Sequence, residues 1–112
     1  LSDPKVQAKS HQETGYLPIT TAAFKITEDA GFTRPQLQEF LEPRGVDTRT
    51  VWSGNVVRHP MMEGVELRQP EEGLPNADQV MRQGMILPCS HGLSDAELEY
   101  VTGLIDEFIA SV

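Results

Sequence analysis

The chain has 112 residues, of which 38% are hydrophobic and 23% are charged, and its formal net charge is −8. This length suits one domain with one modest core, and the composition is that of a folded chain. Only nine residues are lysine or arginine, which argues against a nucleic-acid-binding surface because such a surface must neutralise phosphates. No apolar run is long enough to span a membrane, and residues 1–12 lack the apolar stretch of a signal peptide.

Cys89 is the single cysteine, so the chain cannot form an internal disulfide. This favours a reducing compartment, and we expect a cytoplasmic protein. A metal site needs several ligands at suitable spacing. Cys89 and His91 stand two residues apart, whereas His11 and His59 are distant in sequence, so we expect no metal site.

Residues 1–15 are polar and are interpreted as a linker or entering segment, and residues 16–112 are interpreted as one small domain. Two apolar runs follow, at 16–20 and 23–27. The second run alternates apolar and polar residues and is rich in β-branched side chains, which predicts a half-buried strand.

The next predicted element is a helix that starts at Thr33. Thr33 can act as the N-cap, Gln36 completes a capping box, and Pro35 occupies the first turn, where proline is tolerated. Three apolar side chains then share one face: Leu37, Phe40 and Leu41. Pro43 and Gly45 are expected to end this helix.

Residues 46–52 are predicted to form a second strand. Its alternation places these side chains on one face: Val46, Thr48, Thr50 and Trp52. Residues 53–75 follow as a long irregular segment that glycine and proline interrupt. A loop of this length in a compact domain is usually functional or disordered.

The last third of the chain predicts a short helix, a short strand and a long helix. Asn76 is the expected N-cap of the short helix, which ends near Gly84, and residues 85–88 form a buried strand. Ser94 and Glu97 form the clearest capping box in the chain and start the final helix. The apolar stripe of that helix contains Leu98, Val101, Leu104, Ile105, Phe108, Ile109 and Val112.

This order of elements predicts an α+β fold, with a small sheet of three or four strands and helices packed on one face. Strands and helices do not alternate strictly, and neither the Rossmann nor the P-loop glycine motif occurs.

The highest concentration of side chains that could bind or react with a ligand follows the second strand. There Gly54 precedes three polar side chains. Asn55 offers hydrogen-bond donors and acceptors, Arg58 can bind a phosphate or carboxylate bidentately, and His59 can transfer a proton near neutral pH. Gly54 permits close approach of the backbone to a ligand. The alternative interpretation is a surface turn in which Asn55 bonds its own backbone and Arg58 is solvated.

Other candidate groups carry weaker signals. Cys89 could act as a nucleophile with His91 as its base, but a small buried thiol and a loop histidine have the same pattern. Met61 and Met62 suit gap-filling or interface packing. The acidic pair at 71–72 is typical of a solvated loop.

Four segments together resemble the DegT/StrS-type family of pyridoxal-phosphate (PLP) dependent sugar enzymes. The residues at 31–37 resemble its "GFTR..L" helix start. The segments at 45–49 and 54–60 resemble "G-[IV]-x-TR" followed by "GN..R[QH]P". The segments at 74–81 and 87–95 resemble "PNAD.VM" and "LP.HHGLTD". The "GN..R[QH]P" form is most similar to the lipopolysaccharide-type branch, which includes 3-dehydratases of nucleotide-linked 4-keto-6-deoxy sugars.

The resemblance implies the C-terminal small domain of such an enzyme, acting by 3-dehydration or transamination. It implies a homodimeric parent in which a separate large domain holds PLP. That domain supplies an acidic partner for the pyridine nitrogen and a Schiff-base lysine, which is a histidine in the dehydratase branch. It also implies four substrate-binding residues here: Asn55, Arg58, His59 and His91.

Two hypotheses of different classes follow. In the first, the chain is a domain of a PLP enzyme, and the absence of an initial methionine is one hint of a fragment. In the second, it is a free-standing acidic interaction module that keeps the fold without catalysis. In both, the chain alone is expected to be inactive, with no catalytic residue and no bound cofactor of its own.

Overall fold

The structure is a computed structural model that describes residues 6–8 and 21–112. The apolar run at 16–20 lies outside the described residues. Within the segment interpreted as a linker, Val6–Ala8 form strand β1, and the rest of residues 1–15 lies outside the described residues.

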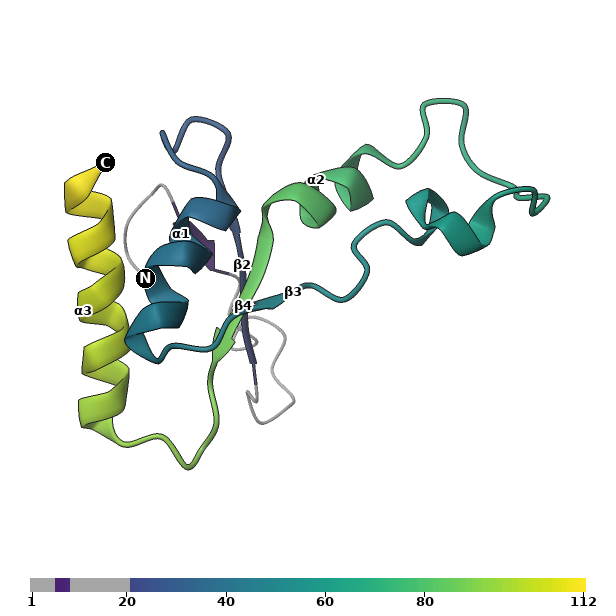
Figure 1. Cartoon of the computed structure of the whole chain (residues 1–112). Coiled ribbons are helices and arrows are strands. Elements are labelled where there is room, and N and C mark those ends of the chain that lie inside the picture. The colour runs from purple at the N-terminus through teal and green to yellow at the C-terminus, as the bar shows by residue number, and fades with distance from the viewer. Residues whose placement is uncertain (1–5, 9–20) are drawn as a thin grey trace.

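Four antiparallel strands form one sheet in the order β1-β2-β4-β3 (Figure 1). β2 (Thr21–Ile26) and β4 (Gly84–Pro88) form its centre and are paired along five residues. β1 (Val6–Ala8) pairs with β2, and β3 (Arg49–Thr50) pairs with β4. The predicted α+β class with three or four strands is confirmed.

α1 (Arg34–Leu41) starts as its capping box predicts, because the Thr33 backbone N–H donates to Gln36 Oε1 at 2.8 Å. Leu37 and Leu41 are completely buried. A 3₁₀ turn follows at 42–44, and Gly45 then adopts a left-handed φ of 81° that ends the helical segment.

α3 (Asp95–Ser111) begins at the second predicted capping box. The Ser94 N–H donates to Glu97 Oε2 at 2.7 Å, and the Glu97 N–H donates back to Ser94 Oγ at 3.3 Å. The backbone hydrogen bond from Ser94 lowers the pKa of the Glu97 carboxyl. Along the apolar stripe, Leu98 and Val112 are exposed because they lie at the two ends of the helix. No helix within residues 21–112 combines the length and apolar character needed to cross a membrane.

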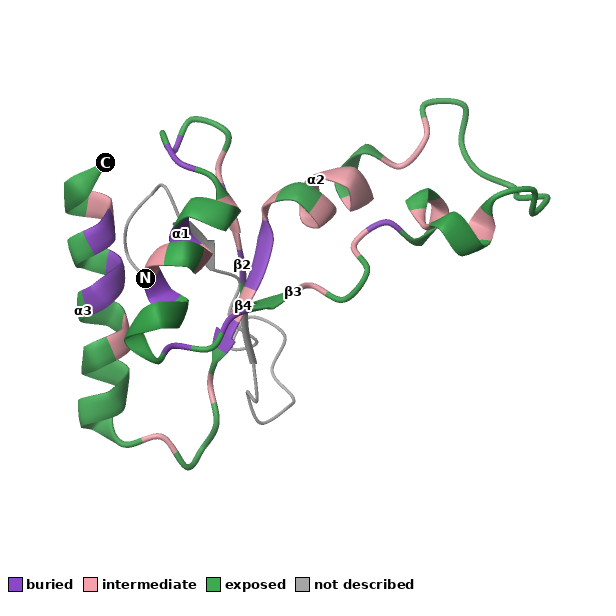
Figure 2. Cartoon of the chain, viewed as in Figure 1, coloured by how far each residue is buried: buried purple, intermediate pink, exposed green. Residues whose placement is uncertain are grey.

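α1 and α3 lie on the same side of the sheet, with α1 between α3 and the strands (Figure 1). Buried residues gather where these two helices face the strands (Figure 2). Phe32 and Phe108 meet edge to face, with ring centroids 5.0 Å apart. The core contains Phe24, Ile26, Ala30, Phe32, Leu37, Leu41, Val46, Met85, Leu87, Leu104, Ile105 and Phe108.

Residues 51–74, called the arm below, extend away from the sheet on the side opposite α3 (Figure 1). The arm contains two 3₁₀ turns, Val56–Arg58 and Pro60–Met62, and leads into α2 (Pro75–Gln83). α2 packs against β2 and β4 near the point where β4 begins. The arm therefore returns to the sheet through α2.

Two boundary predictions are wrong. The strand expected at 46–52 is reduced to β3, because Trp52 adopts a positive φ of 42° and breaks the alternation. Of the four side chains expected on one face, Val46 and Thr48 are buried, whereas Thr50 and Trp52 are exposed. α2 begins at Pro75 and not after Asn76, because proline fits the first helical position without needing a cap side chain.

Candidate functional site

Asn55 lies at the base of the arm and is only 4% exposed. Its Oδ1 accepts a hydrogen bond from the Val57 backbone N–H at 3.1 Å and thereby caps the first 3₁₀ turn. Its Nδ2 donates to Asp78 Oδ1 on α2 at 2.8 Å. One end of the amide therefore fixes the first 3₁₀ turn of the arm, and the other end holds the arm against α2.

Arg58 binds the same aspartate in a bidentate manner. Its Nε pairs with Asp78 Oδ1, and its Nη2 donates to Asp78 Oδ2 at 2.6 Å. The two side chains differ in exposure, at 60% for Arg58 and 15% for Asp78. The hydrogen bonds from Arg58 and then from Asn55 lower the pKa of Asp78 to about 2, and the pKa of Arg58 is raised by the same ion pair.

Gly54 makes a close approach, but to α2 and not to a ligand. Its φ is +67°, and a Cβ added there would lie 2.5 Å from the Cα and Cβ of Met81. The glycine therefore lets the arm pack directly on the helix.

His59 is half-buried, and its Nε2 lies 3.0 Å from the Ser53 carbonyl oxygen. This contact closes residues 53–59 into a loop. Asn55, Arg58 and His59 therefore lie in one continuous structure, as the sequence indicates.

His91 is separated from these three residues. It is exposed in the loop between β4 and α3, whereas α2 precedes the other end of β4 (Figure 1). The described part of the chain thus brings together three of the four residues named from the sequence.

Two further residues belong to this region and carried no signal of their own in the sequence. Asp78 contacts partners 20 and 23 positions away. Arg34 Nη1 donates to the carbonyl oxygens of Met81 at 2.7 Å and Gly84 at 3.0 Å, which ties the start of α1 to the end of α2. Both residues lie in the segments that carry the family resemblance, at 31–37 and 74–81, and this is the signal that could have found them.

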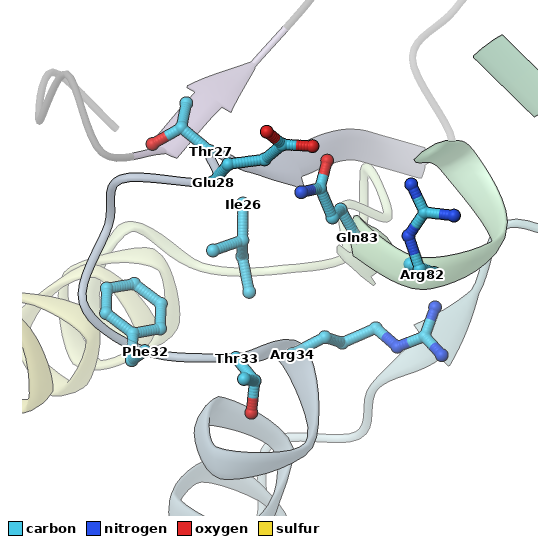
Figure 3. A pocket seen from close by; sticks show the side chains of 8 residues that line it. All are labelled: Ile26, Thr27, Glu28, Phe32, Thr33, Arg34, Arg82 and Gln83. Carbon is cyan, nitrogen blue, oxygen red and sulfur yellow. The ribbon is translucent and has the colours of Figure 1, made fainter. Parts of the chain in front are cut away.

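A pocket of about 270 Å³ lies between the end of β2, the start of α1 and the end of α2 (Figure 3). The Arg34 side chain extends along one edge of it towards the end of α2, which carries Arg82 and Gln83 (Figure 3). Arg34 Nε and Gln83 Oε1 are buried and have no hydrogen-bond partner among the described residues. A second hollow of about 200 Å³ lies on the arm side of Arg34, beside Trp52.

The described residues do not fit a PLP site. An aminotransferase-type site needs a lysine amine for its Schiff base, and Lys25 is the one lysine among residues 6–8 and 21–112. Its Nζ is bonded to Gln79 Oε1 at 3.0 Å, between β2 and α2. The same residues contain no group of three or more histidine, cysteine or acidic side chains arranged to hold a metal ion.

The fold occurs as part of a nucleotide-sugar enzyme of known structure. The E. coli GDP-4-keto-6-deoxy-D-mannose-3-dehydratase shares it with a TM-score of 0.79 at 21% identity, over 92% of this chain and 26% of that one. A model of the DegT/DnrJ/EryC1/StrS aminotransferase family matches residues 3–106. The chain therefore belongs to this family.

Two curated relatives have names that describe sugar chemistry. A dTDP-4-dehydro-2,6-dideoxy-D-glucose 3-dehydratase from Saccharopolyspora spinosa is 40% identical over 88 residues, which is 79% of this chain and 19% of the relative. The lipopolysaccharide biosynthesis protein RfbH of Salmonella typhimurium is 32% identical over 108 residues, which is 96% of this chain and 23% of the relative. The chain thus spans about a fifth of the length of each.

A short segment matches a protein of a different kind. Over 32 residues, or 29% of this chain, it is 56% identical to the sn-glycerol-3-phosphate-binding periplasmic protein UgpB of Yersinia enterocolitica. The match covers 7% of that protein, which is too little to carry its binding function to this chain.

Proposed function

We propose that this chain is the C-terminal domain of a longer, cytoplasmic PLP enzyme that acts on a nucleotide-linked 4-keto-6-deoxy sugar by 3-dehydration or transamination. The observation that carries this proposal is the family match over residues 3–106, together with the small share of each relative that the chain spans. The remaining length of such an enzyme supplies a large domain that holds PLP and performs the bond-breaking chemistry.

The arm is the part of this domain that contacts the substrate. Arg58 is fixed on one edge by Asp78, yet 60% of its side chain is exposed. A guanidinium has five N–H donors, and only part of this set is used by one carboxylate. Arg58 thus presents a pre-oriented cation for the diphosphate of a nucleotide-linked sugar.

Asn55 and His59 support this contact in different ways. Asn55 is buried and is bonded at both ends of its amide, so its role is to position Arg58 through their shared partner Asp78. His59 is half-buried at the same loop, within reach of a ligand at the arm. His91 provides a separate contact from the loop after β4.

The enzyme is a homodimer in this proposal, and the arm docks against the rest of it. Met61, Val65 and Leu67 are exposed on the arm, where they provide apolar area for that contact. Exposed apolar groups concentrated in one projecting segment are typical of a surface that another part of an assembly covers.

The test is Arg58→Ala in the full-length enzyme, with Arg68→Ala as the matched control because Arg68 is exposed on the same arm. Loss of a charge-assisted phosphate contact should lower kcat/KM by about ten- to a hundredfold. The control should leave the kinetics unchanged. Turnover, substrate affinity and melting temperature are measured together. Unchanged kinetics, or an activity loss that only follows a lower melting temperature, would remove Arg58 from the substrate site.

A further inference from the structure

Trp52 has a backbone conformation that tryptophan rarely adopts. Its φ of 42° is the one positive value outside glycine among the described residues. Bulky residues are genuine outliers in this region, and such strain persists only where the surrounding structure imposes it.

Hydrogen bonds on both sides hold this conformation. Thr50 Oγ1 donates to the Trp52 carbonyl oxygen at 3.1 Å, and the Gly54 N–H donates to the Val51 carbonyl oxygen at 3.0 Å. Gly54 is itself packed on Met81 of α2. The turn is therefore fixed from the sheet on one side and from α2 on the other.

The consequence is an indole that points outward. In a regular strand Trp52 would share a face with the buried Val46 and Thr48 and with Thr50, which is exposed at the edge of the sheet. Instead its side chain is 88% exposed, the largest exposure of any large hydrophobic residue that the structure describes. A strained turn that exposes a tryptophan stabilises neither the core nor the sheet.

A hollow of about 200 Å³ lies beside this indole. Val51, Val80 and Met81 form its apolar part. Its polar part comes from Arg34, Thr50, Ser53 and His59. Apolar walls with a few hydrogen-bonding groups are typical of small-molecule sites, whereas a protein-docking surface is flatter and more extended.

We propose that the indole of Trp52 is the platform on which the nucleobase of the substrate stacks, with the adjacent hollow receiving the edge of the base. This inference rests on the proposed function, because a nucleotide-linked sugar contains one large planar ring. Stacking on an aromatic side chain tolerates different bases, since every base has a π face. Trp52 then determines affinity for the nucleotide, while Arg58 contacts its phosphates.

The test is calorimetric titration of the full-length enzyme with thymidine diphosphate and guanosine diphosphate. Trp52→Leu keeps an apolar side chain without a π face and should weaken binding about five- to a hundredfold. Trp52→Phe keeps the π face and should retain most of the affinity. Ribose 5-phosphate, which has no base, should bind the wild type and Trp52→Leu equally.

A fourth protein, Trp52→Asn, separates binding from folding, because asparagine tolerates positive φ. It should match or exceed the melting temperature of the wild type and still bind nucleotide weakly.

Three results would overturn the inference. Equal nucleotide affinity in Trp52→Leu and the wild type would remove the indole from the site. A change of oligomeric state in Trp52→Leu, with nucleotide affinity unchanged, would assign Trp52 to a protein contact instead. A lower melting temperature in Trp52→Asn would make the residue structural. If the wild type binds neither nucleotide, the proposed function itself fails, and this outcome differs from a loss confined to the Trp52 variants.

Discussion

Asp78 is the residue on which the base of the arm depends. It is largely buried and accepts hydrogen bonds from a neutral amide, Asn55, and from a guanidinium, Arg58. Both bonds favour the ionised carboxylate, which explains why its pKa is lowered to about 2. The ionised Asp78 carboxylate therefore fixes Arg58, which we place at the substrate, and Asn55, which helps to position it.

This pKa makes the stability of the arm depend on pH. A carboxyl whose pKa is lower when folded contributes stability above its unfolded pKa, near 3.8, and loses it as pH falls towards the folded value of about 2. The melting temperature should therefore fall between about pH 4 and pH 2. Asp78→Asn should start from a lower melting temperature at pH 7 and fall less in this window. Glu97→Gln is the control for the other lowered pKa, and identical pH profiles for Asp78→Asn and wild type would contradict the prediction.

Gly54 provides a second test of how the arm is held. Alanine there combines a positive φ with a Cβ placed 2.5 Å from the backbone of Met81, so we expect a loss of more than about 2 kcal/mol. Gly64→Ala is the matched control, since its φ is +77° but no atom lies within 4 Å of an added Cβ. It should cost only about 1 kcal/mol, from the backbone conformation alone. Chemical denaturation measures both, and equal losses would show that the packing on α2 is not tight.

At the scale of whole elements, the sequence predicted the helix starts, because these depend on interactions between near neighbours in the chain. The capping boxes at Thr33 and Ser94 join residues three positions apart, and both helices start there. The strand predicted to run to Trp52 fails because the chain turns out of the sheet to pack Gly54 on Met81 of α2, 27 positions later. Contacts of that range leave no periodic pattern in a sequence.

The cap of α3 can be tested directly. Ser94→Ala removes the oxygen that accepts from the Glu97 N–H, and loss of an N-cap hydroxyl typically costs about 1 kcal/mol. Thr102→Ala is the control, because its Oγ1 bonds only to carbonyl oxygens of its own helix, those of Leu98 and Glu99. That change should lie within about 0.5 kcal/mol of the wild type. A loss at Ser94 no larger than at Thr102 would show that the capping box does not set the stability of α3.

For the molecule as a whole, different sequence signals predicted the core and the polar residues of the arm. Apolar spacing predicted most of the core on α1 and α3, since burial of one helix face follows from its period. The clustering of Asn55, Arg58 and His59 was visible because they are close neighbours in the chain. Asp78 holds the arm through a contact with Arg58, 20 positions away, and Arg34 ties α1 to α2 through a contact with Met81, 47 positions away. Neither residue was visible from spacing. The family motifs nevertheless contain both residues.

If a separate large domain holds PLP, as we propose, the chain alone should not retain PLP. Lys25 Nζ is bonded to Gln79 Oε1 at 3.0 Å. Mixed with PLP and then dialysed, the chain should show no visible absorption from an internal aldimine. After borohydride reduction, mass spectrometry should detect only substoichiometric labelling, unchanged in Lys25→Arg. A stoichiometric adduct that survives dialysis and disappears in Lys25→Arg would show that this chain carries its own cofactor site, and the proposal of a separate PLP-holding domain would then be wrong.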